Sequence, residues 1–402
     1  MARILLLSNG HGEDLSGSII GTTLRQYGHE IEALPLVGKG HAYLGAGIKR
    51  IFKVKEFSTG GLGYTSFRGR LTELLQGQLF YLLGLFIRLK LISRQYDLFV
   101  VIGDLVPVLV AWLVGRPTVA YMVAYSSHYE GNLQLPWPCE NCLRSKRFLK
   151  IYSRDKLTEI DLNVKFESKV EFLGNPFMEP VFNCQQPLPK SFKRLGILPG
   201  SRRPELDENL KLLLRGLEYS LSQNLNLNDL SIDIALVHAY DDLSLNKLAV
   251  SFNTNLKPSL SDQSLKYFHI KECKINFYRN NFISLLQSSD VLLSMSGTAA
   301  EQAVGISKPV VQMKGYGPQF TTAFAEAQRR LLGPTVFCAP GKVGSNENLF
   351  KTFVLILDLM EKVRCDDNFK DQMYTEAEMR LGAQGGAYRM AESINSLLTS
   401  NY

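Results

Sequence analysis

Residues 291–305 read Val-Leu-Leu-Ser-Met-Ser-Gly-Thr-Ala-Ala-Glu-Gln-Ala-Val-Gly. The apolar run 291–295 predicts a short buried strand, Ser296-Gly297-Thr298 predicts a turn of small residues, and 299–304 predicts a helix. A strand that passes through a tight turn into a helix is the building block of a parallel α/β sheet. This stretch decides the fold class because the same succession recurs along the chain.

The strand–turn–helix rhythm occurs on both sides of a break rich in proline. Strands are expected at 3–8, 30–36, 97–102, 118–123, 148–152, 170–173, 194–198, 231–237, 266–269, 291–295 and 309–313. Helices are expected at about 14–27, 71–94, 106–114, 205–223 and 282–288. The pattern predicts an α/β protein with two Rossmann-like domains facing a cleft, each a parallel sheet with helices on both faces.

The domain boundaries follow from the same break. Gly174-Asn175-Pro176 and residues 183–189, with Pro187 and Pro189, have the composition of a linker. We therefore expect an N-terminal domain at 1–182 and a C-terminal domain at 190–375. The last helical stretch, 366–398, is long enough to cross back, so residues 376–402 are expected to return to the first domain.

Composition excludes several classes of protein. The chain has 402 residues, 45% hydrophobic and 21% charged, which suits two folded domains rather than a disordered chain. Six cysteines in this length do not form a disulfide scaffold, and Cys139-Glu140-Asn141-Cys142 is a single CxxC without a second pair, so no metal site is expected. The lone histidines His128 and His238 are expected to be structural.

Charge and apolar side chains gather in one window. Residues 39–94 contain ten basic residues against two acidic ones, while the formal net charge of the chain is +7. A basic window rich in Leu and Phe suits an anionic membrane surface, and it carries no nucleic-acid motif. The apolar runs 79–92 and 98–115 are too short or too interrupted to span a bilayer. The start of the chain does not resemble a signal peptide, so a cytoplasmic protein, peripheral on the inner face of a membrane, is expected.

Two turns of the second half are candidate phosphate sites. Ser296, Gly297 and Thr298 open a helix whose free N–H groups can hold a diphosphate, and Glu301, one turn later, can reach a ribose hydroxyl. The alternative is a Ser/Thr-capped helix with an exposed Glu. Leu198-Pro199-Gly200-Ser201-Arg202 likewise follows a strand, which places Arg202 to clamp a phosphate; the alternative is a surface arginine beside Arg203.

Two turns of the first half are candidate polar sites. Asn9-Gly10-His11-Gly12-Glu13 follows the first strand and can cradle a ligand edge through His11 or Glu13, or can be a tight turn without a ligand. Gly103-Asp104 ends a buried strand, where α/β folds bind ligands, so Asp104 is a candidate general base. The alternative is that Asp104 caps the following helix.

These stretches together resemble the lipid-A-disaccharide synthase family and its relatives among two-domain (GT-B) glycosyltransferases. The resemblance covers about residues 3–332. The resemblance rests on five segments: Pro199-Gly-Ser-Arg202 with Glu205, Ser296-Gly-Thr-Ala-Ala-Glu301, Gly12-Glu13 with Ser16-Gly17, the strand ending in Gly103-Asp104, and Gly174-Asn175-Pro176 in place of Gly-His-Pro. The apolar Leu105-Val106-Pro107-Val108 departs from the family, which carries a second Asp and an Asn there, and Ala124-Tyr125-Ser126-Ser127-His128 replaces a Ser-Pro-Ser plus Trp segment.

The resemblance implies an inverting, metal-independent hexosyltransferase that uses a UDP-sugar as substrate, needs no cofactor, and transfers a hexose or hexosamine to a lipid or glycolipid. It implies that Arg202 contacts the diphosphate, that Gly297 and Thr298 hold it at the helix start, that Glu301 binds the ribose, and that Asp104 is the candidate base. Gly200, Ser201 and Ser296 are expected to bind the donor as well. Gly10, His11, Gly12 and Glu13 would lie on the acceptor side. The alternatives are a UDP-sugar 2-epimerase on the same scaffold and a non-catalytic nucleotide-sugar or lipid-binding protein.

Overall fold

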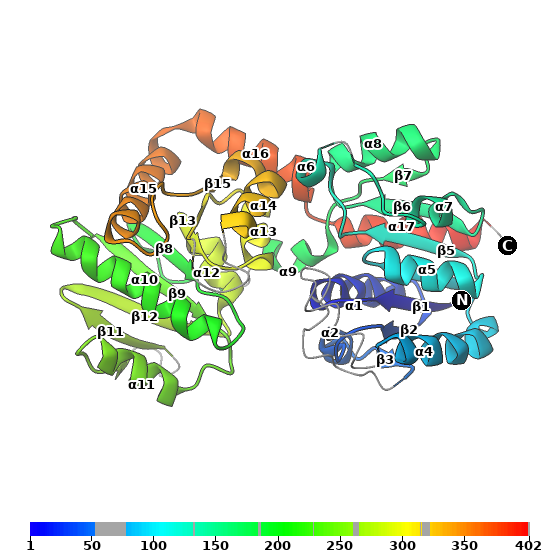
Figure 1. The fold of residues 1–402 in the computed structure, drawn as a ribbon, viewed down its shortest axis with the longest axis horizontal. Helices are drawn as coiled ribbons and strands as arrows, with labels where there is room; N and C mark the ends of the chain where they lie inside the picture. Colours follow the sequence, from blue (N-terminus) through cyan, green and yellow to red (C-terminus); the bar gives the residue numbers. More distant parts are fainter. Residues whose placement is uncertain are drawn as a thin grey trace. The chain divides into compact units, whose positions relative to one another are not determined.

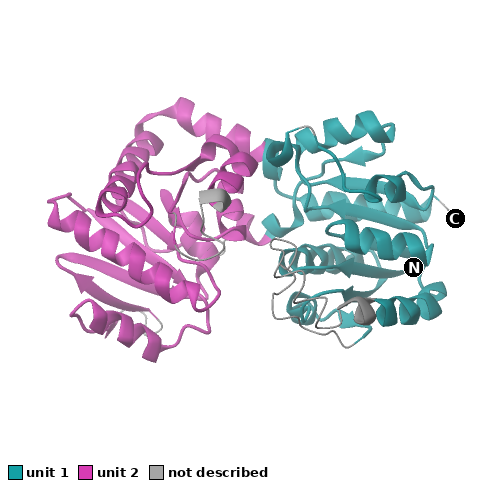
Figure 2. Ribbon diagram, in the orientation of Figure 1, with its two compact units in different colours: residues 1–179, 379–402 teal, residues 180–378 magenta. Residues whose placement is uncertain are grey.

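The computed structural model describes residues 1–52, 78–131, 133–183, 186–227, 229–259, 265–313, 315 and 322–400. The chain divides into two compact units: unit 1 comprises Met1–Glu179 with Met379–Tyr402, and unit 2 comprises Pro180–Glu378 (Figure 2). The chain passes between them within α9 (Glu179–Phe182) and α16 (Asp367–Leu381). The first passage lies three residues before the expected boundary at 182, and the last helix belongs to unit 1.

Unit 1 is built on a seven-stranded sheet with the order β3-β2-β1-β4-β5-β6-β7, in which every neighbouring pair is parallel (Figure 1). The strands are β1 (Arg3–Ser8), β2 (Glu30–Pro35), β3 (Lys49–Arg50), β4 (Leu98–Ile102), β5 (Thr118–Met122), β6 (Phe148–Ser153) and β7 (Val170–Glu171). Ser8 lies beside Ile102 in the register of β1 and β4, so these two strands end together. The strand order reverses between them.

Two layers of helices cover this sheet. Successive side chains of a strand point to opposite faces, so Leu5 and Leu7 join one core and Ile4 and Leu6 join the other. The first core holds α4 (Gln78–Ile92), α5 (Leu105–Val114), α7 (Cys139–Arg144) and α8 (Lys156–Phe166). The second holds α1 (His11–Gln26) and α17 (Gly386–Thr399). The remaining helical segments of the unit are α2 (His41–Gly45), η2 (Ser93–Gln95), α6 (Ser127–Glu130) and η3 (Pro176–Met178).

Unit 2 has an eight-stranded sheet with the order β10-β11-β12-β9-β8-β13-β14-β15. The strands are β8 (Lys193–Leu198), β9 (Leu230–Leu236), β10 (Lys257–Pro258), β11 (Lys266–Ile270), β12 (Cys273–Arg279), β13 (Val291–Ser294), β14 (Val310–Gln312) and β15 (Val336–Phe337). The helices are α10 (Glu205–Ser222), α11 (Asp242–Ser251), α12 (Phe282–Ser288), α13 (Thr298–Gly305), α14 (Thr322–Leu332), η4 (Gly333–Thr335) and α15 (Asn346–Cys365). From β12 to β15 the sheet is parallel and repeats the strand order of unit 1.

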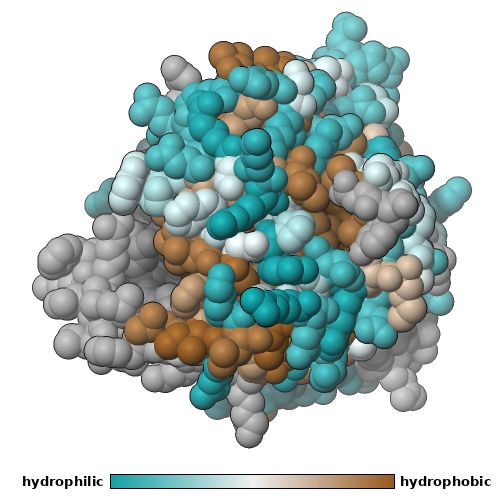
Figure 3. Space-filling view, turned by 90° about the vertical axis from the view of Figure 1, so that its right-hand side faces the viewer, coloured by the Kyte–Doolittle hydropathy of each residue, from teal (hydrophilic) through white to brown (hydrophobic). Residues whose placement is uncertain are grey.

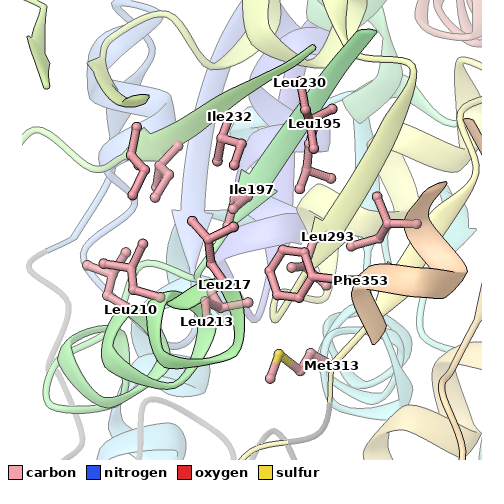
Figure 4. Packing of buried hydrophobic residues seen from close by; sticks show 14 of the residues in the cluster. Leu195, Ile197, Leu210, Leu213, Leu217, Leu230, Ile232, Leu293, Met313 and Phe353 are labelled. Carbon is pink, nitrogen blue, oxygen red and sulfur yellow. The ribbon is translucent and has the colours of Figure 1, made fainter. Parts of the chain in front are cut away.

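The core of unit 2 shows why α10 is a helix at this place. Leu206, Leu210, Leu213, Leu217 and Leu221 recur every three or four residues, so all five lie on one face, and all are buried. Figure 4 shows three of them pointing toward the strand residues of β8 and β9, with Phe353 of α15 beside them. This packing fixes the β8–α10 turn, which carries the predicted phosphate contacts.

The parallel-sheet prediction is wrong at one edge of unit 2. β10, β11 and β12 pair antiparallel. Only Lys271 and Glu272 separate β11 from β12, and a two-residue connection can join antiparallel strands but not parallel ones. Lys271 takes the positive φ of 52° that such a turn requires.

Gly174-Asn175-Pro176 is not a linker, as its composition suggested, but a buried docking point within unit 1. The Asn175 side chain is buried and donates to the carbonyls of Arg154 and Leu381 at 2.8 and 3.0 Å. A Cβ on Gly382 would lie 2.4 Å from the Gly174 Cα, so the two backbones touch. Gly382 (φ 83°) and Gly385 (φ 93°) also divide the long terminal helix expected at 366–398 into α16 and α17.

Candidate functional site

In each unit, the candidate residues lie at the point where the strand order of the sheet reverses. In an open α/β sheet, ligands bind outside the carboxyl ends of the strands at the point where the strand order reverses. In unit 1 this point lies between β1 and β4, and in unit 2 between β8 and β13. The turns after these four strands are the four turns that the sequence singled out.

Unit 2 contains a cavity of about 900 Å³ at this point. The turns after β8, β9, β12 and β13 line it, together with the start of α12 and of α13. The lining includes the predicted Gly200, Ser201, Ser296 and Thr298. A smaller cavity of about 260 Å³ lies beside it and brings Arg202 and Gly297 together with Gly200, Ser201, Ser296 and Thr298. Six of the seven residues predicted for the donor therefore meet here, and the seventh, Glu301, lines neither cavity.

The start of α13 can receive an anion. Gly297 is its N-cap, and no side chain caps the helix, so the alternative of a Ser/Thr cap is not what the structure contains. The Ser296 N–H is already used, because it donates to Ser294 Oγ at 3.1 Å. The N–H groups of the first turn that follow it are the unsatisfied donors of a helix N-terminus, which carries a partial positive charge.

Arg202 and Arg203 have different surroundings. The Arg203 guanidinium lies 4.7 Å from the centre of the Tyr240 ring and donates to Ser244 Oγ at 2.6 Å, so it is held on the surface. Arg202 is exposed at the mouth of the smaller cavity, and among the described residues its guanidinium has no ion pair. A left-handed Gly200 (φ 99°) turns the chain between β8 and this arginine.

The structure places Gln302, not Glu301, on the wall of the larger cavity. Gln302 follows Thr298 by four residues and Ala299 by three, so it lies on the same face of α13 as these two lining residues. His238, expected from the sequence to be structural, instead lines this cavity from the turn after β9. The cavity also takes Asn280 and Asn281 from the turn after β12 and Ser284 from α12, none of which was predicted. The rule that ligands gather at carboxyl ends of strands could have indicated them, but β12 was not predicted.

In unit 1, Asp104 is the N-cap of α5. Its Oδ1 accepts the Val106 N–H at 2.8 Å and the Asn9 side-chain amide at 2.7 Å. The capping alternative is therefore realised, and both of these hydrogen bonds go to one oxygen of the carboxylate. A Cβ on Gly103 would lie 2.3 Å from Asn9 Oδ1, so glycine at 103 (φ 146°) lets the ends of β1 and β4 be joined.

Residues 10–13 form the first turn of α1 rather than a loop. Gly10 is the N-cap, no side chain caps the helix, and His11 is exposed at its first position. The Glu13 carboxylate lies back over Gly10, because a Cβ there would be 2.2 Å from Glu13 Oε2. That is the position of the acid in a capping box. A Cβ on Gly12 would have no described residue within 4 Å.

An acid that the sequence analysis did not consider lies beneath this turn. Asp14 is 1% exposed, accepts the Ser8 hydroxyl at 2.6 Å, and its Oδ2 has no hydrogen-bond partner among the described residues. Tyr43 in turn donates to Ser8 Oγ at 2.9 Å. Burial raises the pKa of Asp14 from 3.8 to about 7, with a contribution from the neighbouring charge of Glu13, although the Ser8 hydrogen bond opposes this.

The remaining candidates have structural surroundings. Cys139 and Cys142 are buried in the core under α5, and burial raises the pKa of the Cys139 thiol to about 12. No group of three possible metal ligands occurs among the described residues. In the basic window, Lys49 pairs with Glu32 at 2.8 Å; Lys53, Lys55, Arg68 and Arg70 lie outside the described residues.

Comparisons with known proteins give no match to a family model or to a curated protein. Solved structures do match over nearly the whole chain. The calicheamicin glycosyltransferase has a TM-score of 0.61 at 16% identity, with 99% of this chain and 98% of that chain covered. MurG from Acinetobacter baumannii has a TM-score of 0.54 at 12% identity, with 98% and 100% covered.

A third neighbour is a UDP-GlcNAc 2-epimerase from Neisseria meningitidis bound to UDP-GlcNAc, with a TM-score of 0.54, 14% identity, and 98% and 100% covered. At these identities the likeness shows the fold, and the neighbours include both transferases and an epimerase. With its two α/β units on parallel-dominated sheets, the chain has the GT-B fold.

Proposed function

We propose that the protein transfers a hexose or hexosamine from a UDP-sugar to a lipid or glycolipid acceptor at a membrane surface, without a metal and with inversion. The observation that carries the donor part is the cavity of about 900 Å³ at the strand-order reversal of unit 2. Its volume lies within the range of small-molecule sites, and its walls combine apolar strand ends with amide, hydroxyl and backbone donors.

The donor would use the residues that this cavity and its neighbour bring together. The diphosphate would accept hydrogen bonds from the first turn of α13, and Arg202 would neutralise the charge that develops on the leaving UDP. Gly200 and Gly297 allow the backbone to approach the phosphates. Gln302 is better placed than Glu301 to contact the nucleoside, because it lines the cavity.

The acceptor would meet the turns of unit 1. Asp104 would take the proton of the attacking hydroxyl as its oxygen bonds to the anomeric carbon and the bond to UDP breaks, which inverts that carbon. His11 and Glu13 would contact the acceptor from the first turn of α1. Asp104 can serve as cap and base together, because its cap bond uses only Oδ1.

The test measures UDP release by the full chain with UDP-GlcNAc, UDP-glucose or an acylated UDP-glucosamine, with and without a membrane lipid extract. We expect lipid-dependent release. Asp104→Asn keeps an oxygen for the Val106 and Asn9 bonds, so it should fold normally and lose about 10²- to 10⁴-fold in turnover. Arg202→Ala should weaken UDP binding by about ten- to a hundredfold, whereas Arg215→Ala, exposed on α10, should not.

A UDP-sugar 2-epimerase is the second candidate, and the neighbour from Neisseria meningitidis favours it. Such an enzyme would change the configuration at C2 of the sugar without an acceptor and without releasing UDP, which proton NMR of the UDP-sugar would detect. That result would replace the transferase. UDP binding with neither reaction on any extract would instead favour a nucleotide-sugar-binding protein.

A further inference from the structure

Two neighbouring helices of unit 1 present apolar side chains outward. On α4, Leu83, Ile87 and Leu91 are 55%, 52% and 78% exposed and recur every four residues, so they form one stripe. On α5, Val106 and Leu113 are exposed as well. We call these five residues the α4–α5 face. Figure 3 shows apolar side chains in several patches on this end of unit 1, one of them a band in its lower half.

The five residues of the α4–α5 face do not belong to the hydrophobic core of unit 1. The opposite sides of the same helices already fill the core through Leu85 and Leu89 of α4 and Val108 and Ala111 of α5. The sequence of α5, Leu-Val-Pro-Val-Leu-Val-Ala-Trp-Leu-Val, has no polar side chain although the helix lies at the surface. Exposed apolar side chains on two helices that contact each other are typical of an interaction surface.

The charges around the face identify the kind of partner. Arg88 and Arg94 are exposed on and just after α4, and neither α4 nor α5 contains an acid. Lys90 donates to the Val114 carbonyl at 2.5 Å and Arg147 donates to the Trp112 carbonyl at 2.8 Å, so two further cations sit at the carboxyl end of α5. Apolar side chains rimmed by cations complement an anionic lipid bilayer, whose headgroups are negative and whose interior is apolar.

The position of the face along α5 connects it with the candidate base. Val106 lies two residues after Asp104, at the start of α5, and Leu113 lies near its other end. The apolar face therefore begins at the carboxyl edge of the sheet where Asp104 lies. An acceptor lying in a bilayer against this face would present its polar end near Asp104. This step rests on the proposed function, whereas the docking itself does not.

We propose that the α4–α5 face docks on an anionic membrane. The described residues contain no helix that is both long and apolar enough to cross a bilayer, so Leu83, Ile87 and Leu91 would enter only the headgroup boundary. Trp137, 84% exposed, precedes α7, which packs against α5. The other tryptophan, Trp112, is on α5 itself, so both report on this side of unit 1.

The experiment is flotation of the purified full chain with vesicles, without any nucleotide sugar. One set is phosphatidylcholine alone and the other contains phosphatidylglycerol as well. We expect binding to the anionic set, a shift of tryptophan emission to shorter wavelength on binding, and loss of both at high salt. Ile87→Glu with Leu91→Glu should weaken the binding by at least about tenfold. Arg88→Gln with Arg94→Gln should also weaken it by about tenfold or more.

The matched control is Ile160→Glu with Val164→Glu on α8. These residues have the same spacing, are 55% and 85% exposed, and belong to the same unit, but their helix also carries Glu159 and Asp161. This control should bind like the wild type. The proposal would be overturned if the α8 control lost as much vesicle binding as the variant Ile87→Glu with Leu91→Glu. It would also be overturned if the wild type bound neutral vesicles as well as anionic ones, or bound neither. Arg202→Ala should still float, so a failure of the donor chemistry is distinguishable from a failure of docking.

Discussion

The buried Asp14 carboxyl is expected to make unit 1 less stable as the pH rises. Its pKa is raised from 3.8 to about 7 in the folded protein, so between these values the folded state binds a proton that the unfolded state has lost. The stabilisation by this proton is complete below about pH 4 and is lost as the pH passes through 7. From pH 5 to pH 8.5 the loss is at most about 3 kcal/mol, since each tenfold change in proton affinity is worth about 1.4 kcal/mol.

Asp14→Asn removes this titration. The Asn side chain keeps an oxygen for the Ser8 hydroxyl, but its amide replaces an oxygen that already lacks a partner in the described part of the chain, which costs about 1–3 kcal/mol at every pH. The constant cost cancels when the variant is compared with itself at two pH values. We therefore expect the wild type, relative to Asp14→Asn, to lose up to about 3 kcal/mol between pH 5 and pH 8.5.

The assay is urea unfolding followed by tryptophan fluorescence. Both tryptophans of the chain lie in unit 1, so this signal reports the unfolding of that unit. Glu392→Gln, exposed on α17 of the same unit, is the control and should not alter the dependence on pH. The reasoning is refuted if wild type and Asp14→Asn show the same change in unfolding free energy between the two pH values.

Two further variants test the packing of unit 2. Gly196→Ala in β8 would place a Cβ 2.3 Å from Ser289 Oγ and 2.4 Å from Leu292 Cδ2. We expect a loss of about 1–3 kcal/mol in the free energy of unfolding, measured by chemical denaturation, whereas a neutral effect would mean that these two side chains move aside freely. Arg194→Met would remove the cation that lies 3.0 Å from the buried Asp233 carboxylate, and we expect the free energy of unfolding to fall by about 3–5 kcal/mol. Adding Asp233→Leu to the same chain should restore part of this loss, and no restoration would contradict the ion-pair argument.

The sequence by itself determined the repeated unit and the turns that carry polar residues. Apolar runs such as 3–8 and 291–294 are buried on both faces in a parallel sheet, and they are therefore visible as continuous hydrophobic segments. The helix 282–288 has the predicted bounds for the same reason, since its apolar residues meet the sheet beneath them. Strand β12 was missed because Lys274, Asn276 and Arg279 interrupt its apolar residues.

Tertiary structure alone decided which of these residues act together. Gly200 and Ser296 line one cavity because β8 and β13 are neighbours in the sheet. No local sequence pattern indicates that these two strands pair. Gln302 rather than Glu301 lines the cavity because of the way α13 is rotated about its axis on the sheet. The buried group of Asp14, Ser8 and Tyr43 comes from three different elements, α1, β1 and α2. A pKa set by burial cannot be predicted before the residues that exclude water are in place.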